Sequence, residues 1–210
     1  MLQKDFILKT SIVCNDDGTH CYCIERELVG QVGQTAILLT LYPSYSANDN
    51  FRLDSTAFHF LGHMEELGLN KVVTVNLFSK IVKGSKLSCR DLNVDEDNLK
   101  YLESLAKMSE YQDIPVIVAY GNSMKTSKAA QESKKRILSL FQDTKHPLLQ
   151  LMCDSADTND TSAIHPLYLG VRCQNKHWYL VPYDTETPNN TEESLVGTKT
   201  TKSKKTGGKN

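Results

Sequence analysis

Four short segments contain the side chains best suited to binding or converting a ligand, and each follows an apolar run or lies in a comparable turn. The amide of Asn76 can donate and accept hydrogen bonds, and the imidazole of His165 can donate a proton near neutral pH. In open α/β sheets, ligands bind beyond the carboxyl ends of the strands, so the repeated placement predicts one shared cleft. The segments are Leu41-Tyr42-Pro43-Ser44, Asn76-Leu77-Phe78, Ala119-Tyr120-Gly121-Asn122 and His165-Pro166-Leu167-Tyr168-Leu169.

Each segment taken alone has an ordinary structural explanation. Pro43 and Ser44 suit a plain turn, and Asn76 can cap the segment that follows it. Gly121 permits a tight turn before a helix, and a histidine before a proline, such as His165, is more often a hydrogen-bonded structural residue than a catalyst. The prediction of a cleft therefore depends on the four segments occurring together and in this order.

Strands and helices alternate from residue 35 onward and would bring these segments together. Nearly continuous apolar runs predict buried strands at 35–41, 71–75, 114–119 and 148–153. Apolar residues three and four apart predict helices at 54–67, 95–108 and 123–141, the first of them capped by Asp54. Two earlier strands, at 6–13 and 21–29, flank a turn sequence and predict a hairpin. Tyr168–Cys173 and Trp178–Val181 are expected to add an antiparallel pair of strands.

This alternation predicts an α/β fold with a parallel sheet and helices on both faces. We expect a three-layer α/β/α arrangement with a central, mainly parallel four-stranded sheet, plus the N-terminal hairpin. A single domain is expected over residues 1–184. Residues 185–210 are rich in Thr, Asn, Ser, Lys and Gly and are expected to be a disordered, Lys-rich tail.

The composition predicts a cytoplasmic protein with no membrane contact. No apolar run approaches the roughly 20 residues of a membrane span, and the N-terminus lacks the hydrophobic core of a secretion signal. None of the six cysteines forms a C-x-x-C pair, so we expect reduced thiols and no metal or other cofactor. Cys14, His20, Cys21 and Cys23 lie close together in sequence, and we interpret them as a hairpin with small buried thiols.

The positive charge is concentrated in a few places. The formal net charge is −1, and it is about −6 without the five lysines of the last twelve residues. We therefore do not expect a generally basic DNA-coating body, and any nucleic-acid contact must come from a local patch or from the tail. The candidate lysines and arginine of such a patch are Lys80, Lys83, Lys86 and Arg90 after the second buried strand, with Lys125 and Lys128 before the long helix.

The four segments, in their order and strand context, resemble an uncharacterised bacterial family whose members have LNPS, NLF, WG and HPLYL motifs. This resemblance covers about residues 5 to 170. A more distant resemblance links the same segments to the uracil-DNA glycosylase superfamily. There, the first strand ends in Asp or Asn before Pro, the second ends in an Asn that hydrogen-bonds a flipped base, and a late loop contains a catalytic His and a Leu wedge.

The superfamily resemblance implies a role for each matching residue. Asn76 matches the base-reading Asn, and residues 118–121 match the third-strand turn. His165, with Pro166, matches the catalytic His-Pro pair, and Leu169 falls near the wedge that enters the DNA duplex. We assign Tyr42, Pro43, Ser44, Asn76, Phe78 and Gly121 to the base pocket, and His165 as the catalytic residue if the protein is active.

Tyr42 is the departure from both families, because it stands where Asp or Asn would precede Pro43. A carboxylate at this point positions the attacking water, whereas a phenol, with an ordinary pKa near 10, is a poor base and is bulkier. Asp49 and Asp54 lie downstream and could substitute, although Asp54 is better explained as a helix cap.

Three hypotheses follow for the function. The first is a glycosylase-like pseudo-enzyme that binds DNA or a protein partner, and the second is an active DNA base glycosylase or nucleobase hydrolase with altered water activation. The third is a small-nucleotide binder that does not contact DNA. The first is preferred. The resemblance also implies a monomer, an origin on bacterial mobile elements, and a DNA-mimicking glycosylase inhibitor as a possible protein partner.

Overall fold

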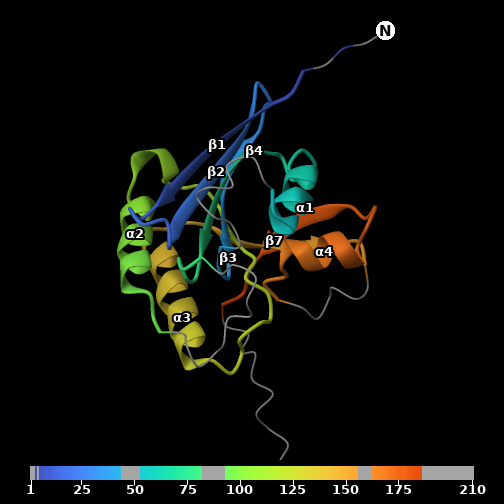
Figure 1. The fold of residues 1–210 in the computed structure, drawn as a ribbon. Helices are drawn as coiled ribbons and strands as arrows, with labels where there is room; N and C mark the ends of the chain where they lie inside the picture. The colour runs from blue at the N-terminus through green and yellow to red at the C-terminus, as the bar shows by residue number, and fades with distance from the viewer. Residues whose placement is uncertain (1–2, 4, 44–52, 82–92, 156–161, 186–210) are drawn as a thin grey trace, which may run out of the picture.

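The computed structural model describes residues 3, 5–43, 53–81, 93–155 and 162–185 of the chain, and Figure 1 shows their arrangement. Seven strands form one sheet, in the order β1-β2-β4-β3-β5-β6-β7. The strands are β1 (Ile7–Cys14), β2 (Cys21–Val29), β3 (Gln34–Thr40), β4 (Leu69–Asn76), β5 (Val116–Val118), β6 (Leu148–Cys153) and β7 (Trp178–Pro182). The helices are α1 (Ser55–His63), α2 (Glu96–Ala106), the 3-10 helix η1 (Ser109–Tyr111), α3 (Lys128–Asp143) and α4 (Pro166–Arg172).

The sheet is mixed. Its middle four strands, β4-β3-β5-β6, pair in parallel, while β1 pairs with β2, β2 with β4, and β6 with β7 in antiparallel register. The expected α/β class is therefore confirmed, but the sheet is larger than the four strands expected. The N-terminal hairpin does not form a separate addition, because β2 pairs directly with β4 from Ile24 to Glu27.

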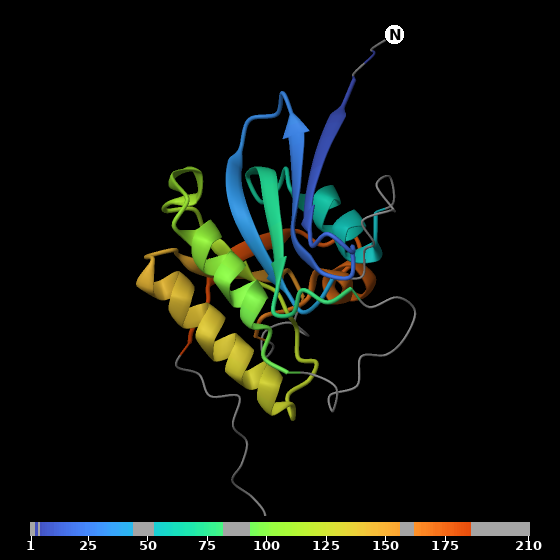
Figure 2. The same cartoon turned by 60° about the vertical axis from the view of Figure 1, so that its left-hand side comes forward.

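Helices cover both faces of the sheet, as Figures 1 and 2 show. Helices α2 and α3 pack on the face that includes Ile37 and Leu39, and α1 and α4 pack on the face that includes Ala36 and Leu38. Because successive side chains of a strand point to opposite faces, a strand covered on both sides must be apolar at every position. This explains the four consecutive apolar residues, Ala36 to Leu39, in the middle of β3.

Side-chain caps set where the helices begin. Asp54 accepts a hydrogen bond from the Ala57 N–H at 2.7 Å, and Asp95 accepts one from the Asn98 N–H at 3.0 Å. Ser127 caps α3, which therefore begins at Lys128 and not at the expected residue 123. Such caps satisfy amide donors that the first helical turn leaves without partners.

The segment after His165 forms a helix, so the expected strand over Tyr168–Cys173 is wrong. His165 is the N-cap of α4 and Pro166 is at its first position, where a fixed φ and a missing N–H favour helix formation. The helix lies against α1 with almost no separation. A Cβ added to Gly170 would come within 2.1 Å of the His59 ring.

The final expected strand is present as β7, antiparallel to β6. Helix α1 ends at His63, four residues earlier than expected, and the chain turns before β4. Within the described part of the chain, every helix is too short or too polar to cross a membrane.

Candidate functional site

A small cavity lies between the sheet and α1, near the carboxyl ends of β3 and β4. Its volume is about 40 Å³, enough for about three water molecules at roughly 10–15 Å³ each. The sheet contributes Ile24, Arg26, Leu38, Thr40, Val72, Thr74 and Asn76, and α1 contributes Thr56, Ala57, Phe60 and Leu61. Tyr42, Pro43, Asp54 and His165 complete the lining. Five chain segments that are distant in sequence therefore meet around one cavity, whose lining combines apolar and polar side chains.

Asn76 is the last residue of β4 and is hydrogen-bonded by one residue of the neighbouring strand β3 and by one residue of helix α2. Its side-chain oxygen accepts a hydrogen bond from the Thr40 hydroxyl at 2.5 Å, and its backbone oxygen accepts one from the Asn98 amide at 2.7 Å. The residue is only 2 % exposed. These contacts fix the orientation of the amide at the cavity wall, as a base-reading or ligand-reading amide would require.

His165 is half-buried, and its hydrogen bonding defines the form of its ring. Its Nδ1 accepts a hydrogen bond from the Leu167 N–H at 3.2 Å. Burial lowers the pKa of His165, although the nearby Asp54 carboxylate partly opposes the shift. The imidazole is thus neutral near pH 7, and because Nδ1 is the acceptor, the proton resides on Nε2. His165 can therefore serve as a neutral hydrogen-bond donor.

Gly121 fixes the position of His165. Its φ is +70°, and a Cβ added there would lie 3.2 Å from the His165 Cβ. Its N–H donates to the Ala163 carbonyl at 2.7 Å, and the Ala163 N–H donates to the Gln150 side chain at 3.0 Å. The loop before α4 is thus held against the end of β5, and only glycine combines this backbone conformation with this close approach.

Asp54 has two roles. It caps α1 through the Ala57 N–H, and it lines the cavity near enough to His165 for its charge to act on the ring. The cap predicted from sequence is confirmed, and the same carboxylate also belongs to the cavity. Tyr42 and Pro43 also line the cavity, and Tyr42 is half-buried and packs partly against the α2–α3 core.

Two residues assigned from sequence to the site, Phe78 and Leu169, lie elsewhere, and Gly121 supports His165 without lining the cavity itself. Phe78 is buried in the core beneath α2 and α3 and does not line the cavity, because the chain turns away after Asn76. Leu169 is fully buried between α4 and the sheet, so a wedge role would require it to leave the core. The exposed apolar side chains of this helix are Leu167, Tyr168 and Val171. Ser44 lies outside the described residues.

The cavity residues on β2 and in the middle of β3 and β4 were not predicted from the sequence. Arg26 is the main example: it lines the cavity and is only 3 % exposed. The signal was available, because Ile24, Arg26 and Leu28 alternate along β2 and must share one face. A charged residue at an inward-facing strand position is rare and marks a polar interior.

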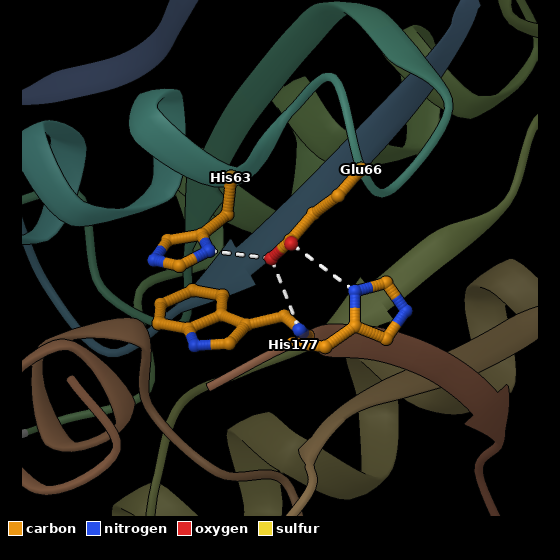
Figure 3. Close-up of polar contacts among 4 residues, drawn as sticks. His63, Glu66 and His177 are labelled. Carbon is orange, nitrogen blue, oxygen red and sulfur yellow. Dashed lines mark hydrogen bonds and ion pairs between the residues drawn. The ribbon is translucent and has the colours of Figure 1, made fainter. Parts of the chain in front are cut away.

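Helix α1, the outer wall of the cavity, is anchored to β7 by Glu66, as Figure 3 shows. Glu66 accepts hydrogen bonds from His63 Nδ1 at 2.5 Å, from His177 Nδ1 at 3.1 Å and from the Trp178 N–H at 3.0 Å. The His63 ring also stacks on the Trp178 indole, with ring centroids 3.8 Å apart. Partial burial acts to raise the pKa of Glu66, but these hydrogen bonds outweigh it and lower the pKa.

The described residues contain no group of three His, Cys, Asp or Glu side chains placed to hold a metal ion. Three lysines of the expected basic patch are described and exposed: Lys80 after β4, and Lys125 and Lys128 near the start of α3. Lys83, Lys86 and Arg90, and residues 186–210 of the expected disordered tail, lie outside the described residues.

Comparison with known proteins gives the family of the chain but no characterised relative. No curated protein and no solved structure matches it. The family model described as "Protein of unknown function (DUF1643)" matches residues 22–167, more than half of the chain. The match includes the cavity residues Tyr42, Asn76 and His165 together with Gly121. The chain therefore belongs to the DUF1643 family.

Proposed function

We propose that the cavity is a glycosylase-like nucleobase pocket in a protein that binds DNA without efficient base excision. The observation that supports this most directly is that Tyr42, Asn76 and His165 line the same cavity although they come from three separate segments. A fixed amide at Asn76 and a neutral donor at His165 are the groups needed to hold a base by its hydrogen-bonding edge. The uracil-DNA-glycosylase-like fold belongs to this proposal.

The identity of Tyr42 and the size of the cavity favour binding over hydrolysis. A phenol stands where the family resemblance places a water-positioning Asp or Asn. A cavity of about 40 Å³ holds only a few water molecules, so a nucleobase with eight or more non-hydrogen atoms enters only if a lining side chain moves. Tyr42 is half-buried, whereas Phe60, the other aromatic residue of the lining, is fully buried, so Tyr42 is the candidate for this movement.

The test measures base-dependent binding and excision together. Fluorescence anisotropy with single-stranded and double-stranded DNA containing uracil, or thymine at the same place, should show preferential binding of the uracil-containing DNA. An assay of the same DNA for abasic sites should detect none. The substitution His165→Ala should weaken uracil-dependent binding by about tenfold, as expected for loss of one well-placed hydrogen bond. The matched control is His20→Ala, because His20 bonds with Asn15 and Thr19 in the turn of the N-terminal hairpin and does not line the cavity.

Two results would contradict the proposal. Equal binding of all DNA probes, unaffected by His165→Ala, would exclude a base pocket. Robust abasic-site formation, abolished in His165→Ala, would exclude a pseudo-enzyme. If DNA is not bound and a DNA-mimicking inhibitor protein is bound instead, the surface serves a protein partner and the base pocket is again excluded.

A second candidate function, nucleobase hydrolysis, is favoured by the placement of Asp54 at the cavity beside His165. In this reaction water attacks the sugar C1′ and gives its proton to the Asp54 carboxylate. The C1′–N bond breaks, and its electron pair leaves with the base, whose negative charge is stabilised by the Nε2–H of His165.

The substitution Asp54→Asn tests the second candidate without uncapping α1, since Asn is as good an N-cap as Asp. If the protein excises bases through Asp54, the variant should keep its unfolding midpoint and lose turnover by a factor of at least about 100. Turnover that survives in Asp54→Asn, or its absence in the wild-type protein, would contradict this candidate.

A further inference from the structure

Two cysteines face each other at the turn end of the N-terminal hairpin. Cys14, the last residue of β1, is the register partner of Cys21, the first residue of β2. The register passes from Val13–Cys23 to Cys14–Cys21, so Tyr22 is the extra residue of a β-bulge. Cys14 and Cys21 pack in the same small apolar cluster, together with Ile12, Ile24 and Ile81.

This placement suits a disulfide bond. Residues directly opposite each other on antiparallel strands have Cα atoms about 4.5–5.5 Å apart, within the roughly 4.4–6.8 Å range of disulfides. Both thiols are free in the structure, with Cys14 half-buried and Cys21 fully buried. A bond between them therefore needs side-chain rotation and little movement of the backbone.

We propose that Cys14 and Cys21 form a reversible intramolecular disulfide when the protein meets hydrogen peroxide. The more exposed Cys14 thiol reacts first, giving a sulfenic acid and one molecule of water. The Cys21 sulfur then attacks the Cys14 sulfur: the S–S bond forms, the S–O bond breaks, and the hydroxyl leaves with the Cys21 proton as a second water. A dithiol reductant restores both thiols by exchange.

The surroundings of Cys21 set the rate and the consequence of this reaction. Burial, together with the neighbouring Cys14, raises the pKa of Cys21, so the second step should be slow at neutral pH and faster in alkali. The Cys21 N–H donates to the Ser79 carbonyl at 2.8 Å. The disulfide would therefore fix the end of the hairpin that contacts the segment following Asn76.

The experiment treats the full chain with hydrogen peroxide and then digests it, without reduction, with a protease that cleaves at Asp16 and Asp17. These residues separate the two cysteines, so the fragments containing Cys14 and Cys21 should stay joined, with a mass two hydrogens below their sum. Reduction should separate them. The linked product should be absent in Cys14→Ser and Cys21→Ser.

Cys23→Ser is the matched control, because Cys23 lies in the same fragment as Cys21 but packs in the core on the other face of β2. It should keep the linkage. Linkage that disappears in Cys23→Ser and persists in Cys21→Ser would overturn the proposal, as would oxidation of Cys14 to a sulfinic acid while Cys21 remains a thiol. The oxidised wild-type protein should also melt a few degrees higher than the reduced one.

Discussion

At the scale of single residues, the backbone conformation of Gly121 fixes the position of His165 at the cavity. The substitution Gly121→Ala places a methyl group 3.2 Å from the His165 Cβ at a φ of +70°. We expect a loss of about 1–3 kcal/mol in the free energy of unfolding, measured by urea titration. Because the ring of His165 must shift, uracil-dependent DNA binding should also weaken, by about tenfold.

Gly30→Ala separates the two effects. Gly30 has a similar φ of +80°, but a Cβ added there meets nothing within 4 Å. The variant should therefore lose stability through backbone strain alone and keep its DNA affinity. Equal loss of affinity in both variants would show that Gly121 acts through general stability and not by positioning His165.

The cavity residues that follow strands could be predicted from the sequence, whereas those within strands could not. Tyr42, Asn76 and His165 are conspicuous because they are polar residues that follow apolar runs or begin a turn. Arg26 shares one face of β2 with Ile24 and Leu28, but only the pairing of β2 with β4 shows that this face lines the cavity. Leu169 was misplaced because its helical environment was not recognised.

At the scale of elements, the anchoring of α1 to β7 predicts a pH-dependent contribution to stability. The substitution Glu66→Gln removes the charge that accepts three hydrogen bonds, and we expect it to cost about 1 kcal/mol. Because the pKa of Glu66 is lowered in the folded state, its contribution is present above its ordinary value of 4.5 and is lost as the pH falls through the lowered pKa. Urea unfolding midpoints across this range provide the measurement.

Glu103→Gln is the matched control, since Glu103 pairs with Lys107 on the exposed surface of α2 and both side chains are more than half exposed. It should change stability less than Glu66→Gln does. If Glu66→Gln lowers the free energy of unfolding by the same amount from neutral to strongly acid pH, the assigned role of the carboxylate is contradicted.

The accuracy of the element predictions followed the strength of the local signal. Strands β2 and β6 were placed with correct bounds, because a turn sequence precedes β2 and a mostly apolar run identifies β6. The helix over Pro166–Arg172 was predicted in part as a strand, because its seven residues include too few turns to show helical spacing. The pairing of β2 with β4 could not be predicted, since local sequence contains no record of which distant strand supplies hydrogen-bond partners.

At the scale of the whole molecule, the uneven charge predicts how DNA binding depends on salt. Removing residues 186–210 takes away the five C-terminal lysines and leaves every described helix and strand intact. The unfolding midpoint should stay unchanged. If the lysines neutralise DNA phosphates, the plot of log affinity against log salt should become less steep. Its slope should lose about 0.7–0.9 in magnitude for each phosphate contact that the deletion removes.

The control for this deletion is a full-length chain in which the five lysines are replaced by glutamine, which removes charge and keeps length. Both variants should show the same reduced slope. An unchanged slope in both would assign any phosphate binding to the body of the protein, where Lys80, Lys125 and Lys128 are the exposed candidates.

The close approach of Gly170 to His59 has a mechanical consequence. With no side chain between them, α1 and α4 should move as one rigid body, and α1 is further tied to β7 through Glu66. The cavity thus has a stiff wall on the helical side, and Tyr42 and Pro43 line it outside the two helices. We therefore expect the bulk of residue 42, and not a hinge movement of α1, to set the size limit of any ligand that the proposed pocket admits.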